Sequence, residues 1–215
     1  MKRVTLTFDN GPHAEVTPYI LDVLGERAVP AHFFVLGREL ASPVGRALVR
    51  RALAEGHRVG NHSFSHETPL GDDPRADAVE AEIGRTEALL NDIAPAEPRR
   101  FRPFGGGGVI GPHLLSTAAA QYLEAHGYTC VLWSSVPRDW LDPQGWSERA
   151  LADCASREHS VVVLHDVQGA CLDALPGFID ALRARGFELS LELPRDCTPI
   201  VDGRALVDLR PFVTA

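Results

Sequence analysis

The sequence predicts an α/β protein built on a parallel β-sheet, and three observations support this. Short apolar or alternating segments take turns along the chain with longer segments of helical periodicity. Three of the longer segments open with a helix-capping residue followed by proline, at Thr17-Pro18, Ser42-Pro43 and Asp73-Pro74. With 215 residues, 45% of them hydrophobic, the chain is long enough to bury one substantial core.

The strands and helices are expected in a regular order. The segment Val4 to Phe8 alternates β-branched and apolar residues and predicts the first strand, and the apolar run Val161 to Leu164 predicts a later one. Each crossover helix returns the chain to the same edge of the sheet, so the strands run parallel. Seven strands could close into a barrel or stay open. The full expectation is strands at 4–8, 31–35, 57–60, near 101, 129–133, 160–164 and 187–191, separated by helices at 17–28, 43–55, 74–92, 112–126, 147–157 and 173–185.

The end of the chain departs from this order. Asp196-Cys197-Thr198-Pro199 and Asp202-Gly203 favour turns, and 205–213 could add an extended piece. The sequence has neither an internal repeat nor a long linker. We therefore expect one domain over 1–215, with a core of about 1–191 and an extension at 192–215 to which the sequence assigns no role.

Charge and cysteine content narrow the possible partners. The formal net charge of -8, without a long basic block, predicts neither nucleic acid nor a membrane as a partner. The first residues lack the uninterrupted apolar stretch of roughly 7 to 15 residues that a secretory signal needs, so we expect a cytoplasmic protein. The four cysteines are far apart and form no Cys-x-x-Cys, which favours reduced, structural thiols.

Polar residues that suit chemistry come directly after the predicted strands. Because parallel strands share a direction, these clusters are expected to meet on one face of the sheet. This convergence is the main functional inference from the residues alone. The clusters are Asp9 and Asn10 after the first strand, His62 and His66 after the third, Arg102 after the fourth, the segment 133–140 with Asp139 after the fifth, and His165-Asp166 after the sixth.

Each residue also has a plainer interpretation. The His62-x-x-x-His66 spacing lets two imidazoles hold one metal from one side of a helical turn, but nine histidines in this length give roughly 0.4 such pairs by chance. Asp9 could simply cap the turn that follows it. Arg102 could be an ordinary ion-paired arginine, and Trp133 and Trp140 could be packing residues. The convergence of all the clusters weighs against these readings.

Five segments also follow the order of a known set of motifs. Thr7-Phe8-Asp9-Asn10-Gly11-Pro12 resembles T-F-D-D-G-P, and His62-Ser63-Phe64-Ser65-His66 resembles H-[ST]-x-x-H. Arg102-Pro103-Phe104-Gly105 resembles R-x-P-Y-G, Asp139-Trp140 resembles the end of D-x-x-D-W, and Leu164-His165-Asp166 resembles L-H-D. The chain is thus similar to the polysaccharide deacetylase or chitin deacetylase family (carbohydrate esterase family 4), which shares the NodB homology domain. The resemblance extends to about residue 190.

The resemblance implies a distorted (β/α)7 barrel of the NodB type and metal-dependent hydrolysis of an N-acyl amide, usually an N-acetyl group on an amino sugar. It implies that Asp9 is the general base and that Arg102 orients it. His165 would protonate the departing amine, and Asp139 would support the charged form of His165. This set suits the reaction, because amide hydrolysis needs an activated water, a clamp on the carbonyl oxygen and an acid for the leaving nitrogen.

The resemblance also implies a metal site and a substrate pocket. His62 and His66 would hold the metal together with Asn10, and the metal would be Zn²⁺ or another divalent transition metal such as Co²⁺ or Ni²⁺. The backbone N–H of Phe104 would help to stabilise the oxyanion. The acyl pocket would be walled by Trp140, Val163 and Leu164. The expected partner is a small-molecule or oligosaccharide N-acyl substrate.

Three positions differ from the family pattern. Asn10 replaces an aspartate, so a neutral amide stands where the family has an anionic ligand, and metal affinity should fall. Asn10 could be a weaker ligand, another residue or water could complete the site, or the metal site could be lost. Val136 replaces the first acid of D-x-x-D-W, while Asp139 is retained. Phe104 in place of tyrosine matters less, because the expected contact uses its backbone.

Other functions stay open at this point. A noncatalytic sugar-binding relative would keep the aromatic residues and lose activity, and a related hydrolase could act on another carbon-nitrogen bond, such as a formamide or a cyclic ureide. Gly106, Gly108 and Gly111 match G-x-G-x-x-G, the spacing of a dinucleotide site. That motif belongs to the first strand-helix unit, so we interpret it here as an active-site loop.

Overall fold

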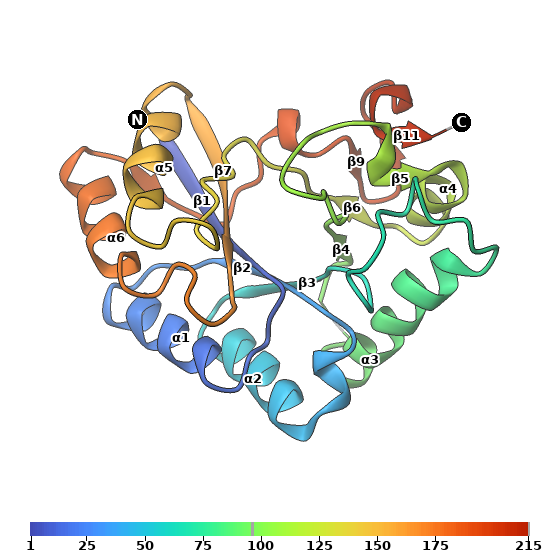
Figure 1. Cartoon of the computed structure of the whole chain (residues 1–215), viewed down its shortest axis with the longest axis horizontal. Coiled ribbons are helices and arrows are strands. Elements are labelled where there is room, and N and C mark those ends of the chain that lie inside the picture. The colour runs from blue at the N-terminus through green and yellow to red at the C-terminus, as the bar shows by residue number, and fades with distance from the viewer. Residues whose placement is uncertain (96, 215) are drawn as a thin grey trace.

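A curled β-sheet forms the centre of the protein, and the helices pack around its outer side (Figure 1). The computed structural model describes residues 1–95 and 97–214. The strands follow one another in space in the order β6, β4, β3, β2, β1 and β7, all parallel. Their bounds are β1 (Arg3–Asp9), β2 (His32–Val35), β3 (Arg58–Asn61), β4 (Arg100–Phe101), β6 (Thr129–Cys130) and β7 (His159–His165).

The register of the strands brings their carboxyl ends to one edge. Asp9 at the end of β1 lies level with Phe34 of β2 and with His165 at the end of β7. Asn61, the last residue of β3, pairs with Val35 at the end of β2. Ser135, which follows β6 in the chain, forms a parallel bridge to Val162 of β7, so the sheet curls back toward its first strands. The predicted convergence of the strand ends is therefore confirmed.

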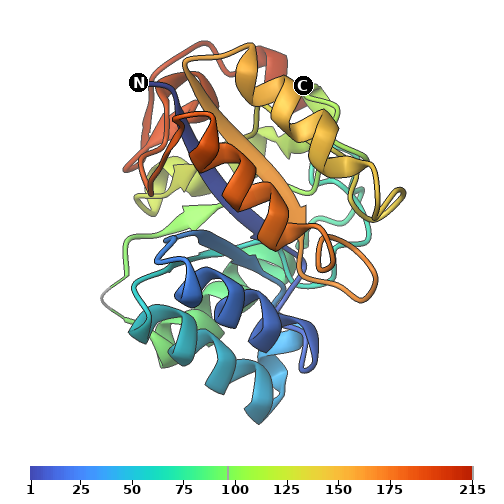
Figure 2. The same cartoon turned by 90° about the vertical axis from the view of Figure 1, so that its left-hand side faces the viewer.

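The described residues form six α-helices, and Figure 2 shows several of them lying along the outer face of the sheet. The predicted cap at Ser42 is confirmed, since its side chain accepts a hydrogen bond from the backbone N–H of Gly45 and Pro43 opens the helix. The helices are α1 (Val16–Glu26), α2 (Pro43–Ala54), α3 (Arg85–Ile93), α4 (Thr117–Ala125), α5 (Trp146–Ala155) and α6 (Leu175–Ala184), with a short 3₁₀ turn η1 (Glu39–Ala41) before α2.

The other two predicted caps are wrong. Thr17 lies inside α1, where its hydroxyl donates to the Asp166 carboxylate at 2.6 Å, so a tertiary contact uses the side chain expected to cap the helix. Asp73 accepts from the backbone N–H of Arg75 and pairs with its guanidinium, and this local turn delays the helix. A π-helical turn, η2 (Glu80–Gly84), then leads into α3.

The helix predicted over 112–126 also starts late. A 3₁₀ turn, η3 (Pro112–Leu114), and a short strand, β5 (Leu115–Ser116), come before α4. The Ser116 side chain accepts from the backbone N–H of Ala119 and so caps α4 four residues after the predicted start at Pro112.

The last part of the predicted core and the C-terminal extension are both built into the sheet. Strand β8 (Glu188–Leu189) pairs with the first residues of β1, and η4 (Arg195–Cys197) leads to β9 (Ile200–Val201), which pairs antiparallel with β6. The predicted turn at Asp202-Gly203 joins β9 to β10 (Arg204–Ala205), and both turn residues have positive φ, 46° and 75°. The predicted extended piece over 205–213 is wrong, because η5 (Arg210–Phe212) precedes the short strand β11 (Val213–Thr214), which pairs with β5.

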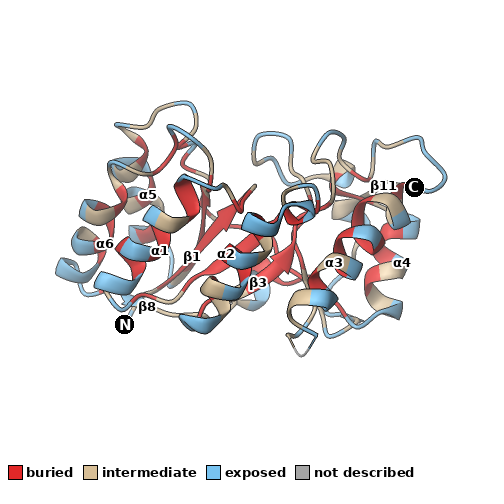
Figure 3. Cartoon of the chain, turned by 90° about the horizontal axis from the view of Figure 1, so that it is seen from below, coloured by how far each residue is buried: buried red, intermediate tan, exposed pale blue. Residues whose placement is uncertain are grey.

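The hydrophobic core lies on both sides of the sheet. Figure 3 shows the strands as the most buried part of the chain. One cluster packs β1, β2 and β7 against α1, α5 and α6, and it includes Trp146 and Phe178 with ring centroids 4.9 Å apart. A second cluster lies around β4, β6 and α4. Within residues 1–95 and 97–214, none of the helices combines the length and the apolar character that crossing a bilayer requires.

Candidate active site

A cavity of about 430 Å³ opens at the edge where the parallel strands end. Eight of the predicted site residues line it, and they come from segments far apart in the sequence. The glycine loop 105–108 forms part of its wall, in agreement with the interpretation as an active-site loop. The predicted residues at the cavity are Asp9, Asn10, His62, His66, Phe104, Trp140, Val163 and His165.

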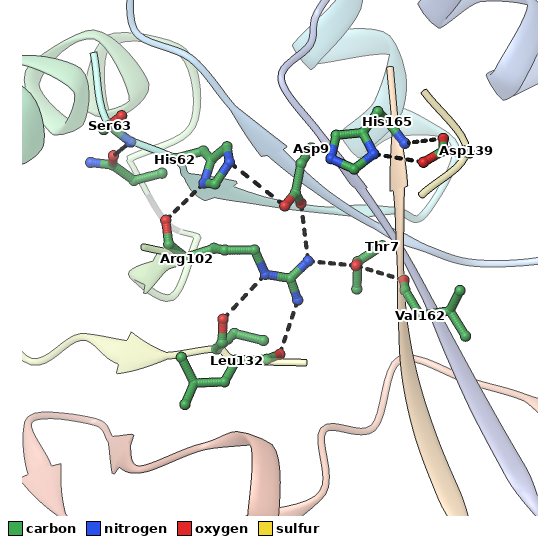
Figure 4. A network of polar contacts seen from close by, with 11 residues as sticks. Thr7, Asp9, His62, Ser63, Arg102, Leu132, Asp139, Val162 and His165 are labelled. Carbon is green, nitrogen blue, oxygen red and sulfur yellow. Dashed lines mark hydrogen bonds and ion pairs between the residues drawn. The ribbon is translucent and has the colours of Figure 1, made fainter. Parts of the chain in front are cut away.

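Asp9 is held from below by a fully buried arginine (Figure 4). The Nη1 atom of Arg102 donates to Oδ1 of Asp9 at 3.0 Å and to the Thr7 hydroxyl at 2.5 Å. The other guanidinium nitrogens of Arg102 donate to the carbonyls of Val131 and Leu132, both at 3.2 Å. Arg102 thus lies behind the cavity, as an orienting residue would. Among the described residues, no backbone N–H donates to the Asp9 carboxylate, so Asp9 does not cap the turn that follows it.

The two imidazoles of the H-x-x-x-H segment lie together beside Asp9. The ring centroids of His62 and His66 are 4.9 Å apart. Nδ1 of His62 donates to the carbonyl of Arg102 at 2.8 Å, which leaves Nε2 unprotonated and 3.6 Å from Oδ2 of Asp9 (Figure 4). Burial lowers the pKa of His62, and burial is also the main cause that lowers the pKa of His66 to about 2. Both rings are therefore neutral at pH 7, the form that binds metals.

The segment that carries these imidazoles is a loop, so the predicted helical turn is wrong. Ser63 and His66 have positive φ, 71° and 57°, which no helix contains. The Asn61 side chain accepts from the backbone N–H of Ser63 at 2.9 Å and donates to the carbonyl of Ile83 at 3.0 Å. These contacts bend the chain directly after β3 and turn both histidines toward the cavity.

Glu82, in the π-helical turn, holds the same loop from behind. Its carboxylate accepts from the backbone N–H groups of Phe64 and Ser65 at 3.0 and 2.8 Å, and from the Ser65 hydroxyl at 2.8 Å. Burial alone would raise the pKa of Glu82, but hydrogen bonds from Ser65 and Arg75 outweigh it and keep that pKa below its usual value. Sequence reasoning missed Glu82, because no motif marks a residue that acts only through tertiary contacts.

His165 faces Asp9 from the other side and is backed by Asp139. Oδ1 of Asp139 accepts from Nδ1 of His165 at 2.7 Å, and Oδ2 accepts from the backbone N–H of His165 at 2.8 Å (Figure 4). Asp139 is fully buried and lies behind the cavity, like Arg102. The Trp140 ring packs edge-on against the His165 ring, with centroids 4.4 Å apart. Nε2 of His165 is thereby left as the ring nitrogen available to a substrate.

One predicted pocket residue does not reach the cavity. Side chains alternate along a strand, so Val163 and His165 point into the cavity while Leu164 points the other way. Leu164 is fully buried in the hydrophobic cluster beneath the helices. The cavity is also lined by residues that were not predicted as binding residues, namely Pro103, Gly105, Gly106, Gly107, Gly108, Trp133, Val136 and Val167.

Whether the residues suit a metal ion depends on Asn10. Within the described parts of the chain, no group of three or more His, Cys, Asp or Glu side chains is arranged to hold a metal. Asn10 lines the cavity with the two histidines, and its Oδ1 atom is buried without a hydrogen-bond partner among the described residues. An unpartnered amide oxygen beside two neutral imidazoles fits a divalent metal, with one neutral ligand where an anion would bind more tightly.

The chain is similar to known deacetylases over most of its length. A family model described as polysaccharide deacetylase matches residues 1–131. A chitooligosaccharide deacetylase of Bradyrhizobium sp. (strain ANU 289) is 35% identical over 203 residues, which cover 87% of this chain and 88% of the relative. A peptidoglycan-N-acetylglucosamine deacetylase of Listeria monocytogenes is 30% identical over 187 residues, covering 87% of this chain and 37% of the relative.

Solved structures show the same likeness. The structure of a T48 deacetylase with substrate is 31% identical with a TM-score of 0.72, covering 88% of this chain and 87% of that one. A family 4 acetyl xylan esterase of Clostridium thermocellum, solved with a cobalt ion, is 30% identical with a TM-score of 0.68, covering 87% and 86% of the two chains. The predicted distorted (β/α) barrel of the NodB type is confirmed.

Proposed function

Because the chain belongs to the polysaccharide deacetylase family, we propose that it is a metal-dependent hydrolase that removes the N-acetyl group from an amino sugar. The observation that carries this proposal is the position of Asp9 between His62 and His165 in one cavity (Figure 4). A base, a pair of metal-binding imidazoles and an acid are the groups that amide hydrolysis needs.

Asp9 acts as the general base. Its Oδ1 is fixed by Arg102 at 3.0 Å, so Oδ2 is the oxygen left to take the proton from the attacking water. Thr7 and the carbonyls of Val131 and Leu132 hold Arg102 in turn, so the orientation of the base is set by the sheet itself.

His165 acts as the general acid on the opposite side of the acyl group. The Asp139 carboxylate accepts from Nδ1, which fixes the tautomer and stabilises the charged ring. Nε2 then gives its proton to the sugar nitrogen as the carbon-nitrogen bond breaks, since an unprotonated amine is a poor leaving group. The backbone N–H of Phe104 contributes a donor to the oxyanion, and Trp140 and Val163 enclose the acyl methyl group.

His62, His66 and Asn10 hold the metal in this proposal. A metal held there would supply Lewis-acid chemistry, which would polarise the acyl carbonyl and make water easier to deprotonate. Two imidazole nitrogens and an amide oxygen suit zinc, and cobalt or nickel as alternatives. The metal content of the protein as purified, measured by elemental analysis, identifies the ion.

The proposed substrate is a soluble oligosaccharide or smaller molecule with an N-acetylated sugar. We also propose a cytoplasmic location, which the four free and buried cysteines support, because thiols stay reduced in that compartment. Cell fractionation with an antibody to the chain tests the location, and recovery from the medium or the cell envelope would contradict it.

The chemistry is tested with the metal-loaded chain on N-acetyl, N-formyl and ureide compounds. We expect release of acetate from N-acetyl sugars, and loss of turnover when a chelator removes the metal. His165→Ala should lower kcat by roughly 10²- to 10⁴-fold while metal content is unchanged, because His165 donates a proton and does not bind the metal. His126→Ala, an exposed histidine on the C-terminal side of α4, is the matched control. Turnover only on formamides or ureides would overturn the proposed reaction.

A further inference from the structure

A second hollow of about 320 Å³ adjoins the active-site cavity, and Gly107, Gly108, Trp133 and Val136 line both. We propose that this hollow binds an anionic group of the substrate, a carboxylate or a phosphate, next to the N-acetylated sugar. The inference deepens the proposed function and rests on it. The remaining residues of the second hollow are Val109, Ile110, Ser134, Arg138 and Arg157.

The charges around the hollow support an anionic ligand. Arg138 and Arg157 both line it, and no Asp or Glu among the described residues does. Neither guanidinium forms an ion pair or a side-chain hydrogen bond with the described residues, although most arginines of those residues are ion-paired. Two unpaired guanidinium groups on one concave surface stand out in a chain of net charge -8. Arginine is the side chain best suited to bind a carboxylate or a phosphate through two parallel hydrogen bonds.

The backbone at Arg138 places this charge beside the acid of the reaction. Arg138 has a φ of 58°, a left-handed conformation that non-glycine residues rarely adopt. Its carbonyl accepts from the backbone N–H groups of Leu141 and Asp142 at 3.1 and 3.2 Å, so the turn is fixed while the guanidinium is free of partners. The next residue, Asp139, holds His165 at 2.7 Å. Because the second hollow shares four lining residues with the active-site cavity, an anion bound by Arg138 belongs to a group next to the N-acetylated sugar.

The departures from the family motifs point the same way. Val136 replaces the first acid of D-x-x-D-W, and its side chain lies at the junction of the two hollows. Asn10 replaces an aspartate on the wall of the active-site cavity. Both changes remove a negative charge from surfaces that the substrate would contact. Val136 carries no charge at this junction, so it does not repel an anion in the second hollow.

Two matched pairs of substrates test the inference. The first pair compares N,N′-diacetylchitobiose with a disaccharide that differs from it in one feature. This feature is a lactyl ether on the second sugar, which carries a carboxylate. In the second, methyl N-acetylglucosaminide is compared with N-acetylglucosamine 1-phosphate. We expect kcat/KM to be about tenfold higher or more for the charged member of one pair, and the pair that shows it identifies a carboxylate or a phosphate as the ligand. No preference in either pair would overturn the inference.

Variants assign the preference to the arginines. The double variant Arg138→Gln, Arg157→Gln should bring the charged-to-neutral ratio of kcat/KM to about one, and Val136→Asp should lower it through repulsion. The control is Arg50→Gln, Arg204→Gln, which makes the same charge change at two exposed arginines away from both hollows and should keep the wild-type ratio. An unchanged ratio in the Arg138, Arg157 variant would overturn the inference.

A binding measurement separates this inference from the proposed function. Calorimetric titration of each compound into the wild-type chain and the two double variants measures affinity without turnover. Affinity for the charged compound should fall roughly tenfold in the Arg138, Arg157 variant and should weaken as salt is added. If no compound is deacetylated but this arginine-dependent binding is seen, the proposed reaction fails and the anion site stands. Equal affinity for charged and neutral compounds would overturn the anion site whatever the reaction.

Discussion

Asn10 decides how strongly the active-site cavity holds a metal. Its Oδ1 atom is buried and has no hydrogen-bond partner among the described residues, so the amide oxygen is available as a ligand. A carboxylate in the same place would add a full negative charge to a set of two neutral imidazoles. Asn and Asp both tolerate the φ of 78° found at this position, so the exchange keeps the backbone.

We therefore predict that Asn10→Asp tightens zinc binding by about tenfold or more. A competition titration against a zinc chelator of known affinity measures the change. Asn91→Asp, at an exposed position of α3, adds the same charge away from the cavity and should leave zinc affinity at the wild-type value. Equal affinity of Asn10→Asp and wild type would contradict Asn10 as a ligand.

Half of the residues that line the cavity could be named from the sequence, because each belongs to a motif at or near the end of a strand. Leu164 could have been excluded as well, since Val163 and Leu164 are consecutive in a strand and must point to opposite faces. Glu82 could not have been found. It lies 18 positions from Phe64 in the sequence, and only the packing of η2 against the loop after β3 brings its carboxylate to those N–H groups.

At the scale of elements, η2 and the loop after β3 act as one unit. The loop contains His62 and His66 and has little regular structure of its own, with two residues at positive φ. Its backbone N–H groups are held by Glu82, which is 3% exposed and also contacts Arg75 at 2.9 Å. A π-helical turn is an uncommon structure that often accompanies functional sites. Here it points the Glu82 carboxylate at the metal-binding loop.

Glu82→Ala should therefore weaken zinc affinity by roughly 10- to 100-fold, the effect that loss of a residue supporting a metal ligand usually has. The same competition titration measures it, and circular dichroism checks that the helices are retained. Glu80→Ala removes the same charge from an exposed position of the same turn and serves as the control. If both variants bind zinc like wild type, Glu82 has no part in positioning the histidines.

Of the helix starts predicted from a capping residue before proline, only the one at Ser42 was correct, and the reason lies in what else each side chain can bind. Ser42 caps α2 as the sequence indicates. Among the described residues, the Ser42 hydroxyl hydrogen-bonds only to groups nearby in the sequence, so no distant partner competes for it. Thr17 has the same Xaa-Pro pattern, yet its hydroxyl binds Asp166, 149 positions away. Capping signals describe local competition for backbone N–H groups. They cannot report a distant partner that competes for the same side chain.

At the scale of the whole molecule, Asp166 connects the first and last parts of the barrel. Its backbone N–H donates to the carbonyl of Asp9 at 2.8 Å, which joins the ends of β1 and β7. Its side chain accepts from Thr17 of α1, and its Oδ1 atom is buried without a partner among the described residues. Burial raises the pKa of Asp166 from 3.8 to about 7. The stability of the fold should then depend on pH through this group.

The direction of that dependence follows from proton binding. Asp166 is protonated in the folded chain and ionised in the unfolded chain between about pH 4 and pH 7, so the folded state binds the extra proton there. The contribution of Asp166 to stability is fully present below the unfolded pKa and is lost as pH rises through the folded one. Over that whole window the loss is roughly 4 kcal/mol, from about three pKa units at 1.36 kcal/mol each.

Asp166→Asn should remove this loss, since the amide keeps an oxygen for the Thr17 hydroxyl and carries no charge at any pH. The free energy of unfolding of the variant relative to wild type should therefore rise by roughly 2 to 3 kcal/mol between pH 5 and pH 8. Urea denaturation at both pH values measures it, with the exposed Asp173→Asn as the control that should show no such rise. A variant that differs from wild type by the same amount at pH 5 and pH 8 would show that Asp166 is ionised in the folded chain throughout, and that its burial does not set the pH dependence of the fold.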